Sequence, residues 1–474
     1  MEERTKTPNI LWICTDQQRF DTIRALGNPH IRTPNLDRLV REGVSFLNAY
    51  TQSPVCTPSR ACFLTGRYPR TTRATKNGAD YFPADEVLVT RLLADRGYDC
   101  GLVGKLHLSA AQGRVEVRPD HDGYRMFKWS HHPEPDWPEK HDYAIWLEEQ
   151  GIWWEEHYQG RNGGIEPQFH QTTWCVNEAV RFMEEKRDGR PWLLSVNPFD
   201  PHPAFDPPAE YRQRYSTEDM PSPKWRKGEL ETKPKHQLKD YQYGGQDGAG
   251  PAVAGMNETE KKEYIADYYA MISLIDDQLG RLLDTLERTG QKENTVIFFH
   301  SDHGEMLCDH GLILKGAYFY QELVHIPLIV SWPGHFPSGV QSRALVELVD
   351  LPETILELTG QEVPYYMQGR SLLPILQGKA DPDKHKDHVY CEFYSALRQH
   401  ADQYATMYFD GRYKLVTYHG REPGEMYDLE MDPDEYENLW MNPEYGAVKA
   451  DLLRRSFDAS VMTLDPKPPK IAGY

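Results

Sequence analysis

The chain has 474 residues, which is enough for one large hydrophobic core or for a large domain with a smaller one. Its hydrophobic content of 39% is typical of a globular protein, and no segment approaches the roughly 18 apolar residues of a membrane span. The formal net charge of −19 argues against nucleic acid as a partner. An anionic ligand would therefore need a local cluster of cations, because the overall field repels it.

The N-terminal segment and the cysteines indicate the cellular compartment in which the protein is expected. The first eight residues, Met-Glu-Glu-Arg-Thr-Lys-Thr-Pro, pass directly into an apolar run, without the ordered regions of a secretory signal peptide. The seven cysteines, an odd number and widely scattered, are typical of reduced thiols. If the chain begins at its natural N-terminus, we expect a cytoplasmic protein.

Strands and helices alternate along most of the chain. The run 9–15 is apolar without alternation, which predicts a fully buried strand, and Thr33 with Pro34 starts a helix that Gly43 ends. Further strands are expected at 45–50, 98–103, 192–196, 295–299 and 327–331, and further helices at 87–96, 172–185 and 265–286. This alternation predicts an α/β fold with a large, mostly parallel sheet between helices.

The pattern changes beyond about residue 385. Short runs with turn residues between them predict antiparallel strands, and a closing helix follows: the strands at 389–393, 405–409 and 413–418, and the helix at 448–457. We therefore predict two units, the first with two insertions: a large domain over 1–385, insertions near 119–165 and 216–256, and a smaller α+β subdomain with an antiparallel sheet over 386–474.

Polar residues follow four of the predicted strands. They are Asp16 and Gln17, Lys105 and His107, His202, and Asp302 and His303. In open α/β sheets, ligands bind outside the carboxyl ends of the strands, so we expect these side chains to converge. Asp16, Asp302 and His303 are hard or borderline metal ligands, and an oxygen-rich site favours Ca²⁺, with Mn²⁺ or Mg²⁺ as alternatives.

A twelve-residue motif supplies the nucleophile for this site. It reads Cys56-Thr57-Pro58-Ser59-Arg60 and continues to Arg67, with a helix expected from Pro58 to Thr65. A nucleophile at the N-terminus of a helix lies near the positive end of the helix dipole, which favours an anion there. The cations Arg60 and Lys105 supply the local positive charge that an anionic ligand needs in a chain with a negative net charge.

The motif resembles the signature of type I sulfatases of the alkaline phosphatase superfamily. This resemblance implies that Cys56 is oxidised to formylglycine by a formylglycine-generating enzyme and that the aldehyde hydrates to a diol. One hydroxyl would attack a sulfate ester, and the other would expel sulfate from the covalent intermediate. The family's fold, a large mixed sheet between helices with a small antiparallel sheet, agrees with the pattern above.

The resemblance also implies roles for the other polar residues. Arg60 would steady the hydrated formylglycine, and Lys105 would hold its hydroxyls and the sulfate oxygens. His107 would take the proton of the second hydroxyl, while His202 and Lys315 would contact the leaving oxygen and either His202 or Lys315 would protonate it. Asp16, Gln17, Cys56, Asp302 and His303 would hold one divalent ion. Many sulfatases have two consecutive Asp residues where this chain has Asp16-Gln17, so one negative charge is missing.

Two other functions fit parts of the pattern. A formylglycine-dependent phosphonate monoester or phosphodiester hydrolase would share the modified Cys and a metal site like this one, but its family has uncharged residues at the positions of Lys105 and His107, which favours sulfate. A catalytically silent anion-binding protein would carry an unmodified Cys56. We expect a small sulfated substrate, a sulfated saccharide or an aryl or alkyl sulfate; the oligomeric state is left open.

Overall fold

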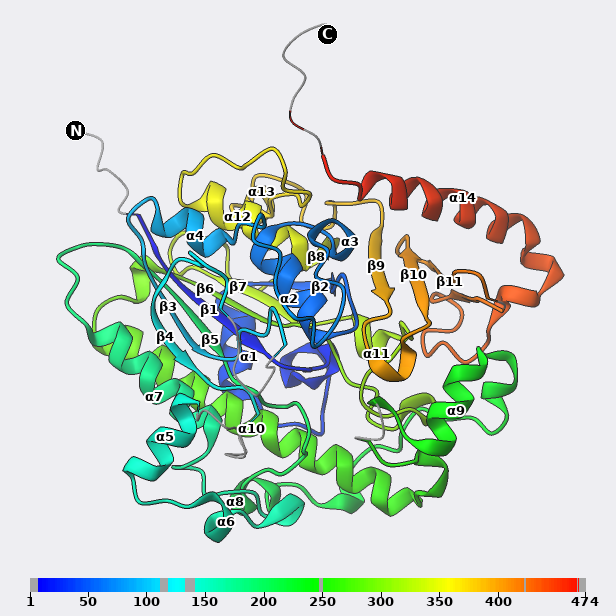
Figure 1. The fold of residues 1–474 in the computed structure, drawn as a ribbon, viewed down its shortest axis with the longest axis horizontal. Coiled ribbons are helices and arrows are strands. Elements are labelled where there is room, and N and C mark those ends of the chain that lie inside the picture. The colour runs from blue at the N-terminus through cyan, green and yellow to red at the C-terminus, as the bar shows by residue number, and fades with distance from the viewer. Residues whose placement is uncertain are drawn as a thin grey trace, which may run out of the picture.

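An eight-stranded sheet forms the centre of the protein (Figure 1). The computed structural model describes residues 7–110, 118–132, 141–246, 250–421, 423–466 and 468. The strands are β1 (Asn9–Thr15), β2 (Val44–Tyr50), β3 (Asp99–Gly104), β4 (Tyr124–Trp129), β5 (Trp192–Asn197), β6 (Thr295–Ser301), β7 (Leu328–Ser331) and β8 (Val340–Glu347). They lie in the order β4-β3-β5-β1-β6-β7-β2-β8.

Parallel pairing brings the strands that precede the predicted site residues to one edge. β1 lies between β5 and β6 and is parallel to both, so that Ile10 is opposite Leu193 on one side and Val296 on the other. β3 is parallel to β4 and β5. β7 runs antiparallel to β6 and β2, which makes the sheet mixed. The carboxyl ends of β1, β3, β5 and β6 therefore point the same way, as the sequence predicted.

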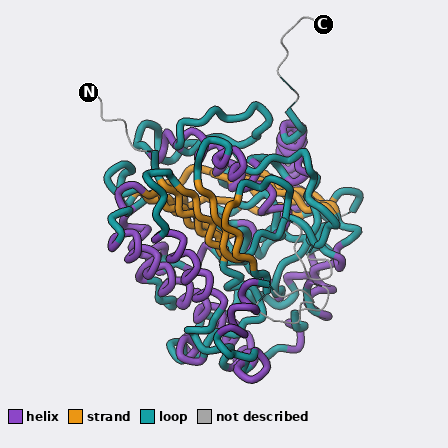
Figure 2. The backbone as a smooth tube through the Cα atoms, turned by 60° about the vertical axis from the view of Figure 1, so that its left-hand side comes forward, coloured by secondary structure: helices purple, strands orange, loops and turns teal. Residues whose placement is uncertain are grey.

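Helices cover both faces of this sheet, as Figure 2 shows. They are α1 (Pro34–Glu42), α2 (Cys56–Thr65), α3 (Pro69–Thr72), α4 (Val89–Ala94), α5 (Asp142–Glu149), α6 (Trp154–His157), α7 (Gln171–Glu184), α8 (Ala209–Arg212), α9 (Lys235–Tyr243), α10 (Glu258–Arg288), α11 (Gln321–Val324), α12 (Leu351–Leu358), α13 (Leu373–Leu376) and α14 (Gly446–Met462).

The side chains of β1 alternate between two core layers because strand residues point to opposite faces. Trp12 packs on the side of α2, where Phe63 contacts it. Leu11 and Ile13 pack on the other side, with residues of α1, α7 and α10. Both layers are apolar, so every side chain of β1 is buried. This explains why the strand reads as one continuous apolar run.

A second sheet of four antiparallel strands lies beside the first (Figure 1). Its strands are β9 (Val389–Tyr394), β10 (Tyr404–Phe409), β11 (Tyr413–Tyr418) and β12 (Glu425–Asp428), in the order β12-β11-β10-β9. Helix α14 packs against β10 and β11. The predicted fold class is confirmed by these two sheets, while the domain division at residue 385 stays a prediction.

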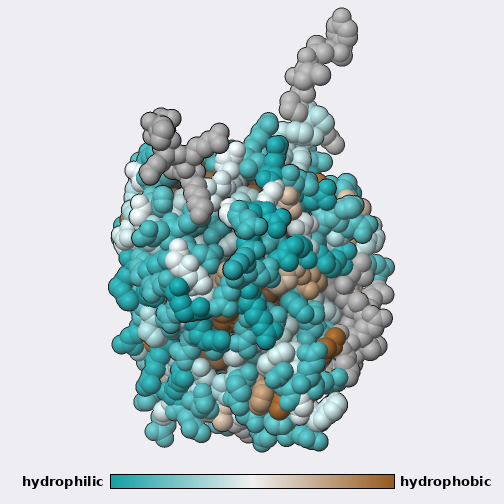
Figure 3. All heavy atoms as spheres, turned by 90° about the vertical axis from the view of Figure 1, so that its left-hand side faces the viewer, coloured by the Kyte–Doolittle hydropathy of each residue, from teal (hydrophilic) through white to brown (hydrophobic). Residues whose placement is uncertain are grey.

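The surface is mostly polar. The face in Figure 3 is largely hydrophilic, with hydrophobic side chains scattered over it. Within the part of the chain that the structure describes, every helix is too short or too polar to cross a membrane. The two segments predicted as insertions are only partly described. The first contributes the edge strand β4 and helix α5, and the second contributes α9.

Candidate functional site

Helix α2 places Cys56 inside the protein at its N-terminal residue. The helix begins at Cys56, two residues before the predicted start, and its ten residues are all buried. It ends at Gly66, whose φ of 71° lies in the left-handed region and whose N–H bonds to the Cys62 carbonyl. The positive end of the helix dipole therefore lies next to Cys56 and favours negative charge there.

The thiol of Cys56 lies among charged groups. Its Sγ is 3.1 Å from His303 Nε2 and 3.7 Å from Asp16 Oδ1. Burial and Asp16 raise the pKa of the thiol, but Lys105, Lys315 and His303 outweigh them and bring it below the ordinary value. These charged groups therefore surround the side chain of residue 56.

Arg60 joins the helix to three strand ends. Its Nε donates to Asp302 Oδ2 at 2.9 Å, and its Nη1 donates to the carbonyl of Lys105 at 3.0 Å. Its Nη2 is 3.5 Å from Asp16 Oδ2 and has no other polar partner among the described residues. The side chain is fully buried, and the two carboxylates keep its pKa above the usual value despite that burial.

The donor set suits a divalent metal ion. Ligand atoms of Asp16, Cys56, Asp302 and His303 lie within 4.8 Å of one another. His303 Nδ1 is 2.8 Å from the Gly304 carbonyl, so Nδ1 carries a proton, and Nε2 is the nitrogen that faces the cluster and would coordinate a metal ion. Two carboxylates and one imidazole nitrogen, all buried, are the ligand types that hold Ca²⁺, Mn²⁺ or Mg²⁺.

Lys105 and His107 differ in how they reach the site. Lys105 Nζ donates to Asp16 Oδ2, and although burial opposes the charge, Asp16 raises the pKa of Lys105. The backbone is not extended through 105–107, because His107 has a left-handed φ of 56°. His107 lies edge-on to His131 at 4.6 Å, and its Nδ1 has no hydrogen-bond partner in the described part of the chain. Burial and the charge of Lys105 hold its pKa well below the usual range.

His202, Lys315 and Gln17 form a hydrogen-bonded row. His202 Nδ1 is 2.8 Å from the Pro203 carbonyl, so its Nε2 is the acceptor for Lys315 Nζ at 2.8 Å. Lys315 Nζ also donates to Gln17 Oε1 at 2.5 Å. Burial and the adjacent Lys315 keep the pKa of His202 well below its usual range. His202 is therefore neutral here, and Lys315 holds the proton between them.

The predicted residues come together, with one exception. Direct contacts link these nine: Asp16, Gln17, Cys56, Arg60, Lys105, His202, Asp302, His303 and Lys315. His107 touches His131 instead. Sequence reasoning missed Asn77, whose Oδ1 accepts from the Thr57 N–H at 2.9 Å, and Glu305, which binds Gln17. No motif or spacing pointed to Asn77.

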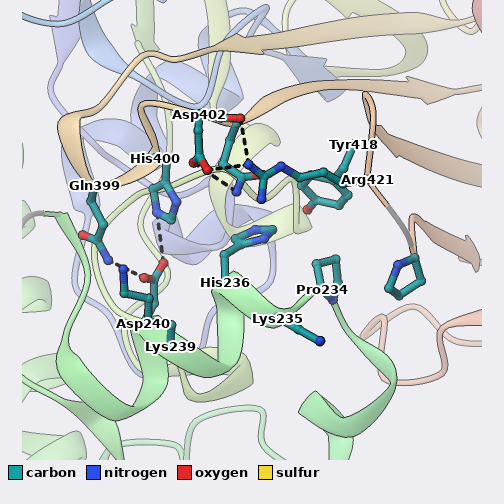
Figure 4. Close-up of a pocket in the computed structure, with 12 residues that line it drawn as sticks. Pro234, Lys235, His236, Lys239, Asp240, Gln399, His400, Asp402, Tyr418 and Arg421 are labelled. Atoms are coloured by element: carbon teal, nitrogen blue, oxygen red, sulfur yellow. Dashed lines mark hydrogen bonds and ion pairs between the residues drawn. The ribbon is translucent and has the colours of Figure 1, made fainter.

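A pocket of about 470 Å³ lies outside this group of residues, and none of them lines it (Figure 4). His236 of α9 lines it and bonds through Nε2 to the carbonyl of Ala317 at 2.9 Å. Lys235 and Lys239, also from α9, line it and form no ion pair with any described residue. Residues of the small sheet and its loops close the other side, so the pocket lies between the segment 216–256 and that sheet.

Comparisons with known proteins agree with this site. A sulfatase family model matches residues 8–361, and a model of the C-terminal part of N-sulphoglucosamine sulphohydrolase matches residues 308–460. The chain is 32% identical to the multifunctional alkaline phosphatase superfamily protein PehA of Trinickia caryophylli, over 94% of each chain. It is 29% identical to an arylsulfatase of Clostridium perfringens (strain 13 / Type A), over 94% of this chain and 93% of that one.

The solved structures add a second kind of relative. The crystal structure of a phosphonate monoester hydrolase of Agrobacterium radiobacter has a TM-score of 0.83 and 25% identity, covering 97% of this chain and 96% of that one. The fold is therefore that of the alkaline phosphatase superfamily. Within it, the match of the family model over most of the chain shows that the protein belongs to the sulfatase family of hydrolases.

The environment of His107 predicts the acid side of the pH–rate profile. A general base must be neutral, and burial together with Lys105 lowers the pKa of His107, so kcat/KM for 4-nitrophenyl sulfate should fall only as the pH drops below 6.5. His107→Gln should lose this limb and about 10²–10⁴ in rate. His131→Gln is the matched control and should keep the limb. An acid limb above pH 6.5 that survives in His107→Gln would contradict the assignment.

Proposed function

We propose that the protein hydrolyses a sulfate ester, with the formylglycine derived from Cys56 as nucleophile. The observation that carries this proposal is the location of Cys56 Sγ at the first residue of a buried helix, 3.1 Å from His303 and 3.7 Å from Asp16. The presence of both Lys105 and His107 favours sulfate, and the sulfatase family supports it. A formylglycine-generating enzyme would be the maturation partner.

The residues of the site suit the two steps of such a reaction. In the first, a diol hydroxyl gives up its proton and its oxygen bonds to sulfur, the bond from sulfur to the alcohol oxygen breaks, and the alcohol oxygen takes a proton, so that one proton passes in balance from the diol to the alcohol. In the second, a base removes the proton of the other hydroxyl, the carbon–oxygen bond to sulfate breaks, and water restores the diol. A divalent ion held by Asp16, Gln17, Asp302 and His303 would supply positive charge to the sulfate oxygens.

The protons that move in these steps are assigned to three side chains. Lys315 donates to the lone pair of His202 Nε2, so Lys315 holds the proton that the leaving oxygen needs. His107 is neutral, and its Nδ1 makes no hydrogen bond to the described residues, as the base of the second step requires. Lys105 and Arg60 keep Asp16 charged: burial alone would raise its pKa, and these two cations lower it.

A saccharide is the substrate class that the pocket next to α9 supports, because its His236 bonds to the carbonyl of Ala317, two residues after Lys315. The pocket combines the cations Lys235 and Lys239 with the rings of His236 and Tyr418, which suits an anionic sugar unit. Hydrolysis of aryl sulfates but of no sulfated mono- or disaccharide in a panel would contradict this class.

A cytoplasmic location is also proposed, because all seven cysteines are free and buried; recovery in a periplasmic or secreted fraction would refute it.

Phosphonate monoester or phosphodiester hydrolysis is the second candidate. The similarity to the Agrobacterium radiobacter enzyme, with a TM-score of 0.83, favours it. The residues at positions 105 and 107 separate the two candidates, since a lysine and a histidine there fit a sulfatase.

Paired turnover of two substrates tests the choice. Protein whose Cys56 peptide carries the aldehyde should hydrolyse 4-nitrophenyl sulfate with a higher kcat/KM than 4-nitrophenyl phenylphosphonate. The physical reason is that Lys105 and His107 serve the diol and the release of sulfate. A preference for the phosphonate would transfer the assignment to the second candidate.

Removal of the metal should abolish turnover, because the sulfate oxygens would lose the positive charge of the ion that Asp16 and Asp302 would hold. We propose Ca²⁺ as the ion. After treatment with a chelator and dialysis, added Ca²⁺ should restore activity better than Mn²⁺ or Mg²⁺. Better recovery with Mn²⁺ or Mg²⁺ would change the assigned ion, and indifference to the chelator would remove these carboxylates from the metal role.

A further inference from the structure

The side chain of Gln17 is fixed at both ends of its amide. Its Nε2 donates to Glu305 Oε2, and its Oε1 accepts from Lys315 Nζ at 2.5 Å. Glu305 as a carboxylate only accepts, and Lys315 as an ammonium only donates, so the amide has a single orientation that satisfies both. The backbone of Gln17 is held as well, because its N–H bonds to Asp302 Oδ1 at 2.9 Å and its carbonyl accepts from Tyr268 at 2.5 Å.

The carboxylate of Glu305 also closes the loop that leads to Lys315. Its Oε1 accepts from the backbone N–H of Leu307 at 2.9 Å and of Leu314 at 2.5 Å. These two residues mark the ends of the loop, and Lys315 follows the second directly. Both have a positive φ, 46° and 64°, a conformation that non-glycine residues rarely adopt without support. Glu305 is fully buried, so water does not compete for these bonds.

The pairing of Gln17 with Glu305 explains why this chain has Gln at position 17, where many sulfatases have a second Asp. A second carboxylate at position 17 would face the carboxylate of Glu305 inside the protein, where like charges repel strongly. An amide turns a donor toward Glu305 and still presents an oxygen to Lys315. Glu305 thus carries the negative charge that position 17 lacks. Its carboxylate contacts Gln17 and is one residue further from the reacting groups than Gln17 is.

We propose that Glu305 is a positioning residue that sets the orientation of the Gln17 amide and the location of Lys315, and that it is the reason why this chain has Gln rather than Asp or Glu at position 17. The inference rests on the proposed function, in which Lys315 and Gln17 serve the reaction. Glu305 touches neither substrate nor metal and acts through these two neighbours.

Single substitutions test each half of the pair. Glu305→Gln places an amide nitrogen against the Gln17 nitrogen, and Gln17→Glu places two carboxylates together. Each should lower kcat about 10–100-fold, as removal of a residue that orients a ligand typically does. Glu229→Gln is the matched control: Glu229 holds His310 of the same loop at 2.9 Å but does not contact Gln17, so its kcat should stay within about threefold of the parent's.

The exchange variant Gln17→Glu/Glu305→Gln is the decisive comparison. Gln at 305 would keep an oxygen for Leu307 and Leu314 and donate its NH₂ to Glu at 17, whose second oxygen would face Lys315. The hydrogen-bond pattern is complete and the total charge is unchanged. We expect kcat to recover at least tenfold over the lower single variant, with a melting temperature about 3 °C or more above it.

Two results would overturn the proposal. One is a kcat of the single variants within about twofold of the parent's; the other is an exchange variant whose loss of kcat equals the combined losses of the two single variants. If the single variants do not fold, a folded exchange variant with recovered kcat supports the proposal, and an unfolded or inactive one overturns it. Turnover is measured with whichever of the two 4-nitrophenyl substrates the parent hydrolyses. A failed sulfate assignment therefore shows in the parent alone, and a failed positioning role shows only in the variants. The melting temperatures give the same comparison without turnover.

Discussion

Arg60 is the residue on which the arrangement of the site depends, because its buried guanidinium joins a helix to the ends of three strands. It contacts Asp302 after β6, Asp16 after β1 and the carbonyl of Lys105 after β3. A buried ion pair that loses one partner costs about 3–5 kcal/mol, since the remaining charge is left without compensation. The parallel sheet brings the ends of these strands to one edge. The contacts of Arg60 then fix the position of α2 relative to that edge.

The position of the nucleophile follows from this constraint. Cys56 and Arg60 are four residues apart on α2, so they share a face of the helix, and what anchors one locates the other. The negative net charge of the chain is met locally, because Lys105 and Lys315 join Arg60 in a site that also holds Asp16 and Asp302. The scaffold thus supplies a rigid edge, and the charged side chains supply affinity for an anion.

Much of this arrangement could be predicted from the sequence. Central strands such as β1 are buried on both faces and read as apolar runs, and the rule that ligands bind at strand ends predicts from chain positions alone that Asp16 and Asp302 lie close together. The strands that escaped prediction, β4, β8 and β12, lie at sheet edges, and polar residues interrupt their apolar runs. The contact of Glu305 with Gln17 spans 288 positions, and no local pattern encodes it. The left-handed backbone of His107 was likewise invisible, because it is imposed by the fold around it.

The proposed nucleophile is a hydroxyl of the hydrated aldehyde at position 56, and one measurement tests this directly. Protein would be prepared with graded levels of a formylglycine-generating enzyme, and the fraction of aldehyde in the Cys56 peptide would be determined by mass spectrometry alongside the turnover of 4-nitrophenyl sulfate. The account predicts that turnover rises in proportion to the aldehyde fraction and extrapolates to zero without it. Turnover that is equal in protein with unmodified Cys56 would contradict the mechanism.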